Sequence, residues 1–301
     1  MSVLRGAILA AADSPRIQQF VGRYGMRLGA ARFVAGETLD EVVVTLRRLN
    51  EQGLRTNTTL LGEAVENREA TGRVVEAYEE VLRRIAVEKL QTNVALKLTH
   101  LGVLIDEELA YGNLERLVAE AARLGNFIRI DMEDSPLVDV TLRIYRRLRE
   151  AGHDNVGTVL QAYLYRSEDD LDSLLPLKPN LRIVKGAYRE APEVAYPRKE
   201  NVDAAYARLV ERSIAEGAFT AVATHDERLI EHAIGLGAGA DRFELQMLYG
   251  VRPQLQLDLV RCSHRVLVAT PYGPDWYPYL MRRLAERPAN LTFFLRSAIR
   301  G

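Results

Sequence analysis

Short apolar segments alternate with amphipathic segments along most of this chain, and this alternation restricts the fold more than any other feature. Between Leu61 and Ala269 the apolar segments recur over seven intervals that span 208 residues, about 30 residues each. That length suits a strand, a helix and the connections to the next parallel strand. Eight such units predict an α/β fold, a (β/α)8 barrel of the TIM type, and an open doubly wound sheet is the alternative if one or two strands are misread. The predicted strands are TNTTLL (56–61), VALKL (94–98), FIRID (127–131), VGTVLQAYL (156–164), LRIVKGAY (181–188), FTAVATH (219–225), RFELQML (242–248) and HRVLVAT (264–270), the last ending near Ala269.

The first part of the chain carries no strand pattern. We therefore expect an N-terminal helical extension at 1–53, with about three helices, and a catalytic barrel at 54–301. Ser14 and Pro15 suit the cap and first residue of a helix. Thr38 and Glu41 have the spacing of a capping box, and the helix that they open is predicted to stop at Gly53.

Charge and composition exclude several classes of function. The formal net charge of −1 argues against a nucleic-acid-binding surface, which needs a basic excess. No apolar run approaches the roughly 18 residues that span a bilayer, and residues 2–11 predict a short helix rather than a signal peptide. A single cysteine, Cys262, rules out an internal disulfide and fits a reducing cytosol. We expect a cytoplasmic protein, with peripheral contact at the inner face of the membrane left open by the apolar 2–11 segment.

Polar residues interrupt the predicted strands near their carboxyl ends, where a buried parallel strand should be nearly all apolar. In a barrel these ends meet at one mouth, so the side chains would need one another or a ligand. The five histidines form no HxH or HExxH pattern, which argues against a metal site. Two of the lysines keep a Schiff-base lyase open as an alternative. The strand-end residues are Lys97, Asp131, Gln161, Lys185, His225 and Gln246.

The segment PYGPDWYPYLMRRLAERPAN (271–290) predicts a last helix with Pro278 in its first turn. Arg282 and Arg283 lie in its middle, and Glu286 is spaced to pair with either. The helix could stay outside the barrel wall with its arginines in solvent. Alternatively it tips over the mouth, where the arginine pair would bind a carboxylate by forked hydrogen bonds.

Seven motifs in order resemble the proline dehydrogenase family of flavoenzymes. They are VALKLTHLG (94–102), IRIDMED (128–134), VLQAYLYRS (159–167), RIVKGAY (182–188), ATHD (223–226), FELQMLYG (243–250) and YLMRRLAERP (279–288). The resemblance covers nearly the whole chain and is closest to the compact monofunctional bacterial enzymes. It implies a distorted (β/α)8 barrel with its last helix over the mouth, and FAD held noncovalently at the strand ends. It also implies oxidation of L-proline to Δ1-pyrroline-5-carboxylate by hydride transfer to flavin N5, with electrons passed to a membrane quinone.

The same resemblance carries roles onto individual residues. Asp131 and Arg182 would be the catalytic pair. Arg182 and Gln161 would also contact the flavin ring. The substrate would contact Lys97, Leu248, Ala269, Arg282, Arg283 and Glu286. The rest of the FAD site would comprise Met132, Val184, Lys185, Gly186, Ala187, Thr224, His225 and Gln246.

Ala269 departs from the family pattern, which has a tyrosine in Tyr-x-Pro-x-Gly before the last helix. A methyl group in place of a phenol ring leaves room for about one or two extra heavy atoms. This predicts a 4-substituted proline such as 4-hydroxyproline as substrate, or proline bound with reduced affinity. Alternatively, Tyr272 or another side chain refills the space. Two other functions stay open here, the lysine lyase and a non-catalytic regulatory barrel. The intact set of Lys97, Asp131, Arg182 and the last-helix residues argues against the latter.

Overall fold

Eight parallel strands form a closed barrel in which each strand pairs with the next and β8 pairs with β1. This excludes the open sheet and confirms the predicted barrel. The computed structural model describes residues 19, 25–26, 29–62 and 65–286, without the side chains of residues 282–286. The strands are β1 (Arg55–Leu60), β2 (Thr92–Leu96), β3 (Ile128–Ile130), β4 (Val156–Gln161), β5 (Asn180–Val184), β6 (Phe219–Ala223), β7 (Phe243–Leu248) and β8 (Val266–Tyr272).

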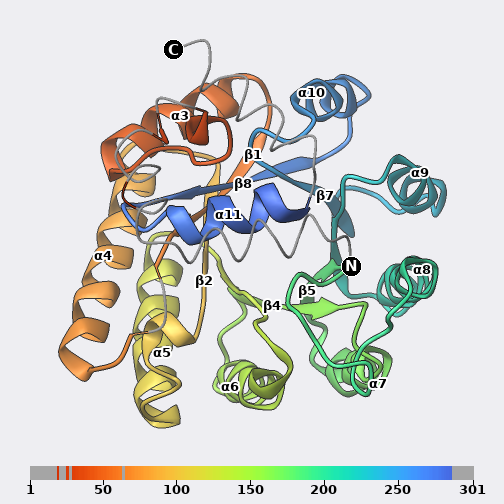
Figure 1. Cartoon of the computed structure of the whole chain (residues 1–301), viewed down its shortest axis with the longest axis horizontal. Coiled ribbons are helices and arrows are strands. Elements are labelled where there is room, and N and C mark those ends of the chain that lie inside the picture. Colours follow the sequence, from red (N-terminus) through yellow and green to blue (C-terminus); the bar gives the residue numbers. More distant parts are fainter. Residues whose placement is uncertain (1–18, 20–24, 27–28, 63–64, 287–301) are drawn as a thin grey trace.

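Helices surround the barrel and alternate with its strands (Figure 1). The described α-helices are α3 (Leu39–Glu51), α4 (Arg68–Val87), α5 (Glu107–Arg123), α6 (Val138–Glu150), α7 (Ser167–Leu174), α8 (Lys199–Ala215), α9 (Glu227–Gly235), α10 (Pro253–Arg261) and α11 (Tyr277–Glu286). Short 3-10 turns are η1 (Ala30–Arg32), η2 (Thr99–Leu101), η3 (Ser135–Leu137) and η4 (Leu175–Leu177). The predicted helix start at Ser14 lies outside the described residues.

Local sequence signals explain where α3 begins and which surface it covers. Thr38 Oγ1 accepts a hydrogen bond from Glu41 N, and Glu41 Oε2 accepts one from Thr38 N, which confirms the predicted capping box. The apolar face of α3 lies against β1 and β8 and belongs to the same buried cluster as the barrel. The predicted division at residue 53 stays a prediction, although α3 shares the barrel's core.

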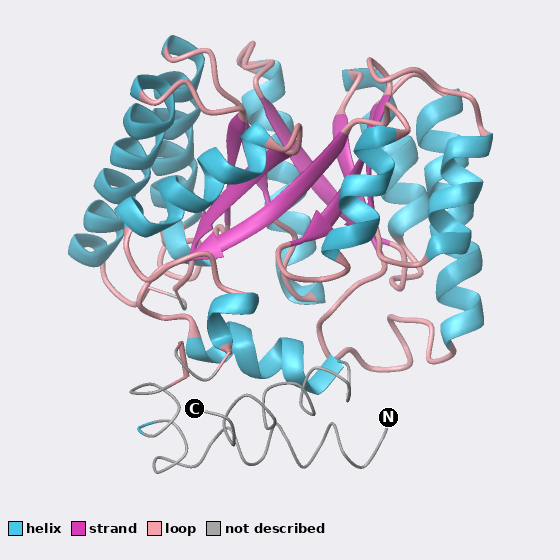
Figure 2. Cartoon of the chain, turned by 90° about the horizontal axis from the view of Figure 1, so that it is seen from above, coloured by secondary structure: helices cyan, strands magenta, loops and turns pink. Residues whose placement is uncertain are grey.

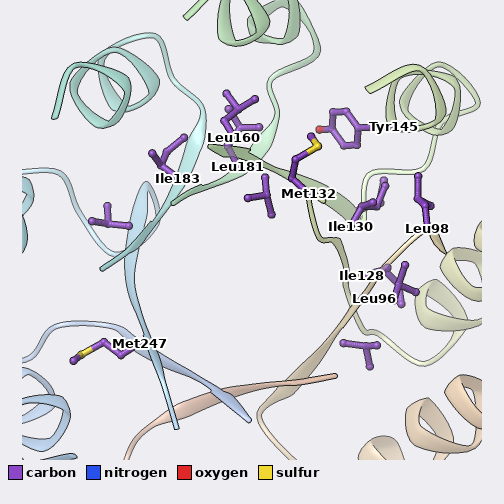
Figure 3. Close-up of a cluster of buried hydrophobic side chains, with 14 of the residues drawn as sticks. Leu96, Leu98, Ile128, Ile130, Met132, Tyr145, Leu160, Leu181, Ile183 and Met247 are labelled. Carbon is purple, nitrogen blue, oxygen red and sulfur yellow. The ribbon is translucent and has the colours of Figure 1, made fainter. Parts of the chain in front are cut away.

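The barrel keeps its apolar residues on the outer face of the strands and many polar residues on the inner face. Leu96, Ile130, Ile183 and Met247 lie between the strands and the helices (Figure 3). The alternating positions of the same strands face inward because side chains switch faces at each residue. In the strand register, each of three large inner side chains pairs with at least one alanine. Arg129 pairs with Ala95 and Gly157, Arg182 with Val159 and Ala221, and Gln246 with Ala223 and Leu267.

The last described helix crosses the mouth of the barrel instead of lying along its wall. α11 passes in front of the strands in Figure 1, and Figure 2 shows it beyond the ends toward which the strand arrows point. β8 continues to Tyr272, past the end predicted near Ala269, because its pairing with β1 extends through Pro271 and Tyr272. The predicted end near Ala269 was therefore three residues short. The tipped helix confirms the second of the two placements considered from sequence.

Candidate active site

Arg182 lies at the centre of the polar residues inside the barrel. Its Nη1 donates to Asp131 Oδ1 at 2.6 Å, its Nε donates to Gln246 Oε1 at 2.6 Å, and its Nη2 lies 3.4 Å from Asn57 Oδ1. The Arg182 and Asp131 side chains are 11% and 24% exposed. β1, β3, β5 and β7 thus converge on one guanidinium. Because two acceptors fix its plane, the remaining N–H groups point in set directions.

A second tier of contacts orients Gln246. Its Nε2 donates to Glu244 Oε1 at 2.7 Å, and Glu244 Oε2 accepts from Arg265 Nε at 2.7 Å. Glu244 is buried and takes both hydrogen bonds. A carboxylate can only accept here, so the amide nitrogen of Gln246 must face Glu244 and its oxygen must face Arg182.

Arg129 is a buried cation on the same inner surface. Its Nη1 donates to the carbonyl oxygens of Thr158 at 2.9 Å and Asn180 at 2.6 Å. Burial, and then the positive charge of Arg182, lower the pKa of Arg129 to about 9. The guanidinium is accommodated because Gly157 beside it has no side chain: a Cβ there would lie 2.5 Å from Arg129 Nη1.

The connections after β2, β3 and β4 are joined at Glu133. This buried carboxylate accepts from Thr99 N at 3.1 Å and Thr99 Oγ1 at 2.7 Å, and its carbonyl oxygen accepts from Gln161 Nε2 at 2.8 Å. Burial raises the pKa of Glu133, although the Thr99 hydrogen bonds oppose that shift. Lys97, partly exposed, follows β2 directly, so Glu133 ties the segment behind Lys97 to the segment behind Asp131.

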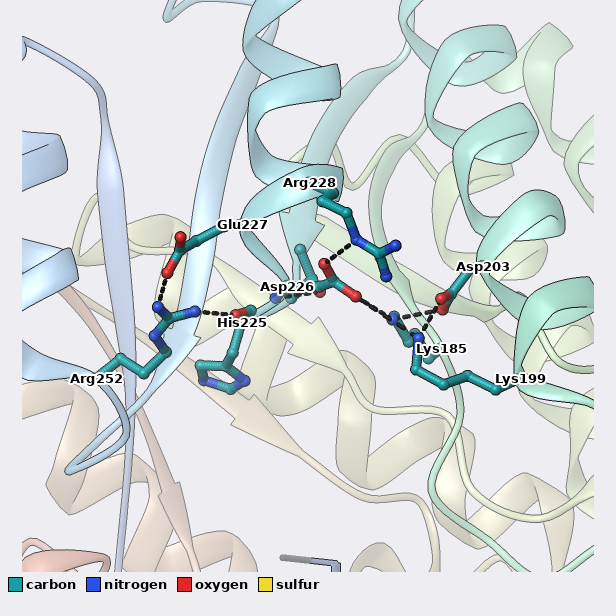
Figure 4. A network of polar contacts seen from close by, with 9 residues as sticks. Lys185, Lys199, Asp203, His225, Asp226, Glu227, Arg228 and Arg252 are labelled. Atoms are coloured by element: carbon teal, nitrogen blue, oxygen red, sulfur yellow. Dashed lines mark hydrogen bonds and ion pairs between the residues drawn. The ribbon is translucent and has the colours of Figure 1, made fainter.

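Lys185 lies in an ion-pair network at the rim. Its Nζ is 2.5 Å from Asp203 Oδ1 on α8 and 3.3 Å from Asp226 Oδ2 before α9, and Lys199 contacts the same carboxylates (Figure 4). Burial alone would raise the pKa of Asp203, but the hydrogen bonds from the two lysines outweigh it and lower that pKa. Two carboxylates therefore hold Lys185 Nζ in ion pairs at the rim.

The loops after β5 and β6 supply the remaining predicted cofactor residues. His225 Nε2 accepts from Leu248 N at 2.9 Å, and Asp226 N donates to the hydroxyl of buried Thr224 at 3.2 Å. Gly186 has φ +112, and a Cβ there would lie 2.2 Å from the Tyr163 ring, so only glycine fits. Val184 is half-buried and Ala187 exposed. Met132 instead packs in the apolar core cluster that contains Tyr145 (Figure 3), so its side chain does not line the mouth.

Ala269 and Tyr272 lie on opposite faces of β8. Ala269 pairs with Leu248 and Asn57 in register and is partly exposed on the inner face. Tyr272, three positions on, belongs to the buried outer cluster, and burial raises its pKa. Tyr272 therefore does not refill the space at Ala269.

The three last-helix residues cannot be placed as side chains. α11 includes positions 282, 283 and 286 in its backbone. The side chains of Arg282, Arg283 and Glu286 lie outside the described residues, so their predicted contact with substrate stays a prediction.

Several residues of this site were missed from sequence. Glu244 lies between apolar Phe243 and Leu245 in β7, where alternation was a usable signal. Asn57 has threonines on both sides in β1 and carries no such signal. Glu133 is part of the IRIDMED motif but was not singled out. Asp203 and Asp226 come from a helix and a loop, and no sequence spacing connects them to Lys185. Among the residues that the structure describes, no group of three or more His, Cys, Asp or Glu side chains could hold a metal, and no helix is long and apolar enough to cross a membrane.

A family model described as proline dehydrogenase matches residues 42–296. The chain belongs to the proline dehydrogenase family. It is 40% identical to proline dehydrogenase 1 of Bacillus subtilis over 302 residues, covering 99% of this chain and 100% of that one. It is 42% identical to the proline dehydrogenase of Deinococcus radiodurans over 308 residues, covering 99% and 98%. These full-length matches confirm the resemblance drawn from the seven motifs.

A solved structure supports the fold alone. Proline utilization A from Bdellovibrio bacteriovorus, inactivated by N-propargylglycine, superposes with a TM-score of 0.80 at 24% identity, covering 87% of this chain and 33% of that one. The chain is thus an oxidoreductase of the proline dehydrogenase family with the family's barrel. Because the chain belongs to this enzyme family, the two alternative functions, a Schiff-base lysine lyase and a non-catalytic regulatory barrel, are set aside.

Proposed function

We propose that this protein oxidises L-proline to Δ1-pyrroline-5-carboxylate with FAD as the electron acceptor. The observation that supports it most is the Arg182 cluster at the barrel mouth, held by Asp131 and Gln246, in a chain of the proline dehydrogenase family. FAD, when bound, would supply a two-electron acceptor that takes a hydride from the proline ring carbon at N5.

The chemistry of the strand-end residues fits a flavin. A flavin ring has an apolar end and an end rich in nitrogen and oxygen atoms. The mouth offers half-buried Val184 at the end of β5, and the guanidinium of Arg182 on the same strand. Thr224 and the backbone at Gly186 extend this surface along the rim. We assign the cofactor to the ends of β4 to β6 on this basis.

The substrate requires cations for its carboxylate and an apolar surface for its ring. Lys97, partly exposed at the end of β2, would bind the carboxylate together with Arg282 and Arg283. Leu248, at the end of β7, would contact the ring. Asp131 accepts a hydrogen bond from Arg182, and its negative charge reduces the repulsion between the nearby lysine and arginine side chains.

Anaerobic titration of the purified protein tests the proposal. The protein should be yellow with an oxidised flavin spectrum, and L-proline should bleach it in the absence of air. A colourless protein that gains no proline-oxidising activity with added FAD would contradict the proposal.

A second substrate is favoured by one feature, the small side chain of Ala269 on the inner face beside Leu248. Because Tyr272 faces away, space remains for a 4-hydroxyl group on the proline ring. Measuring kcat/KM for L-proline and trans-4-hydroxy-L-proline side by side decides between them. A preference for proline of a thousandfold or more would rule out the substituted substrate.

We further propose a membrane quinone as the second electron acceptor and a cytoplasmic location with peripheral contact at the inner membrane face. A water-soluble quinone should reoxidise the proline-reduced enzyme faster than dioxygen does. Equal reoxidation by both would remove the reason to invoke a membrane acceptor.

A further inference from the structure

Residues 30–37, which we call the N-terminal clamp, connect the end of the barrel to its last helix. Ala35 N donates to Pro271 O at 2.8 Å, and Gly273 N donates to Gly36 O at 3.0 Å. Arg32 Nε also donates to the carbonyl oxygen of Gly250, in the connection after β7, at 3.3 Å. The clamp therefore contacts β8 and the connection after β7, on the Ala269 side of the mouth.

The same segment receives the first turn of α11. Trp276 is only 2% exposed, and its indole Nε1 donates to Glu37 Oε1 at 2.8 Å. Leu280 and Met281 are buried in one small cluster with Phe33 and Val34, separate from the main core. Because Trp276 and Leu280 are four residues apart, they lie on one face of the helix, which is the face seated on the clamp.

Glu37 is itself held in place. Its backbone N–H donates to Glu41 Oε2 at 2.6 Å, the carboxylate that also closes the capping box of α3. A Cβ at Gly36 would lie 2.6 Å from Glu41 Cβ, so the backbone passes α3 as closely as it can. α3 packs on β1 and β8. A continuous path of contacts thus runs from the barrel wall through α3 and Glu37 to Trp276.

We propose that Glu37 and Trp276 are positioning residues that set the pose of α11 over the mouth. This rests on the proposed function, in which Arg282 and Arg283 of the same helix bind the proline carboxylate. Position 282 is six residues after Trp276, about 9 Å along a helix at 1.5 Å per residue. A small rotation about the anchor therefore displaces the carboxylate site while leaving the flavin site at the strand ends untouched. A misplaced substrate-binding group loses affinity steeply with small displacements.

Glu37→Ala and Trp276→Phe test the inference. Glu37→Gln is the conservative variant. Glu231→Ala, on the exposed face of helix α9, is the control. The measurements are KM and kcat for L-proline, flavin content, and the Kd of cyclopentanecarboxylate, which has the ring and carboxylate but no oxidisable amine. Glu37→Ala and Trp276→Phe should raise KM and this Kd about tenfold. The kcat and flavin content should stay within about twofold of wild type. Glu37→Gln keeps an acceptor oxygen and should recover most of the affinity, and Glu231→Ala should match wild type.

Each outcome separates this inference from the proposed function. If the wild type is not bleached by L-proline, the proposed function fails. If the wild type is bleached but both variants bind proline and cyclopentanecarboxylate as it does, the positioning role is wrong. Equal losses of kcat, flavin and melting temperature would show a structural role instead and would also overturn it. Should Glu37→Ala not fold, Trp276→Phe, which removes the indole donor and keeps a smaller aromatic ring in the same cluster, decides the matter by the same measurements.

Discussion

At the residue scale, Arg182 is the side chain whose geometry most limits what the site can do. Three strands supply its acceptors, and Asp131 and Gln246 are both within 2.6 Å. A lysine has one point-like ammonium and cannot bond both acceptors in the plane of a fork. Glu244 accepts a hydrogen bond from Gln246 Nε2 and so holds the Gln246 amide in place. The Gln246 oxygen therefore has little freedom to move toward a side chain that replaces Arg182.

We therefore expect Arg182→Lys to lower kcat/KM for proline by about a hundredfold, since a preorganised donor at the reacting centre is lost. The barrel should stay folded. Steady-state kinetics and circular dichroism measure the two effects. Arg261→Lys, on the exposed surface of α10, is the control and should be unchanged. A loss of less than threefold for Arg182→Lys would remove Arg182 from the catalytic centre.

Ala269→Tyr tests whether the small inner residue sets substrate choice. A phenol ring on the inner face beside Leu248 should fill the space open to a 4-hydroxyl group. The ratio of kcat/KM for trans-4-hydroxy-L-proline to that for L-proline should fall about tenfold or more, because an overfilled pocket rejects the larger ligand. Ala122→Tyr, on the exposed face of α5, serves as the comparison. An unchanged ratio would show that position 269 does not contact the substrate ring.

His100 gives the fold a defined pH dependence. Burial, and then the charge of Lys97, lower its pKa from 6.5 to about 4. The folded state therefore holds a neutral ring while the unfolded chain takes up a proton below about pH 6.5. The stability that this contributes is present above that pH and is lost as the pH falls toward 4. The total is on the order of 3 kcal/mol.

The melting temperature should accordingly drop between pH 7.5 and pH 5, and His100→Gln should show a shallower drop over the same interval. His264→Gln, in the turn before β8, should follow the wild type. If the melting temperatures of the wild type and His100→Gln fell equally between pH 7.5 and pH 5, the assignment of this pH dependence to His100 would be wrong.

At the scale of elements, the sequence predicted all eight strands and most of the helices between them. Strands with continuous apolar runs and capped helices such as α3 carry their own local signals. The end of β8 was missed because the apolar run ends near Ala269, whereas pairing with β1 continues to Tyr272. Packing between elements explains the residues of the site that were missed. Asp203 meets Lys185, and Glu133 meets Thr99, only once separate units have assembled.

The fit between β3, β4 and β5 depends on Gly157. A Cβ there would lie 2.5 Å from both Arg129 Nη1 and Asn180 O. Gly157→Ala should lower the free energy of unfolding by about 2–3 kcal/mol through overpacking, measured by urea denaturation. Gly72→Ala, in α4 with no atom near the added methyl group, should instead stabilise by about 0.5–1 kcal/mol. Equal changes in the free energy of unfolding for Gly157→Ala and Gly72→Ala would contradict the close packing around Gly157.

At the scale of the whole molecule, the described residues form two separate buried clusters. The main cluster includes the barrel strands and the helices around them, whereas the small one joins the N-terminal clamp to α11. A small cluster buries less apolar surface and has less free energy holding it closed. We therefore expect the contact between the clamp and α11 to open at a lower free energy than the barrel unfolds.

Native-state hydrogen exchange should detect this. The amide of Leu280, bonded to Trp276 O, should exchange with a lower opening free energy than amides in β5 or β6. Exchange of Leu280 at the same free energy as the β5 amides would mean that clamp and barrel unfold as one unit.

The docking of α11 on the clamp also has a consequence for the order of events during synthesis. The clamp leaves the ribosome before any barrel strand, whereas α11 follows all eight. The clamp surface that binds α11 is therefore synthesised first and has no α11 to bind until the strands and wall helices have been translated. If the proposed function holds, a nascent chain would complete the strand ends proposed to hold the flavin before it could form the proposed carboxylate site. Proline turnover is therefore expected to begin only when α11 has been synthesised and has docked on the clamp.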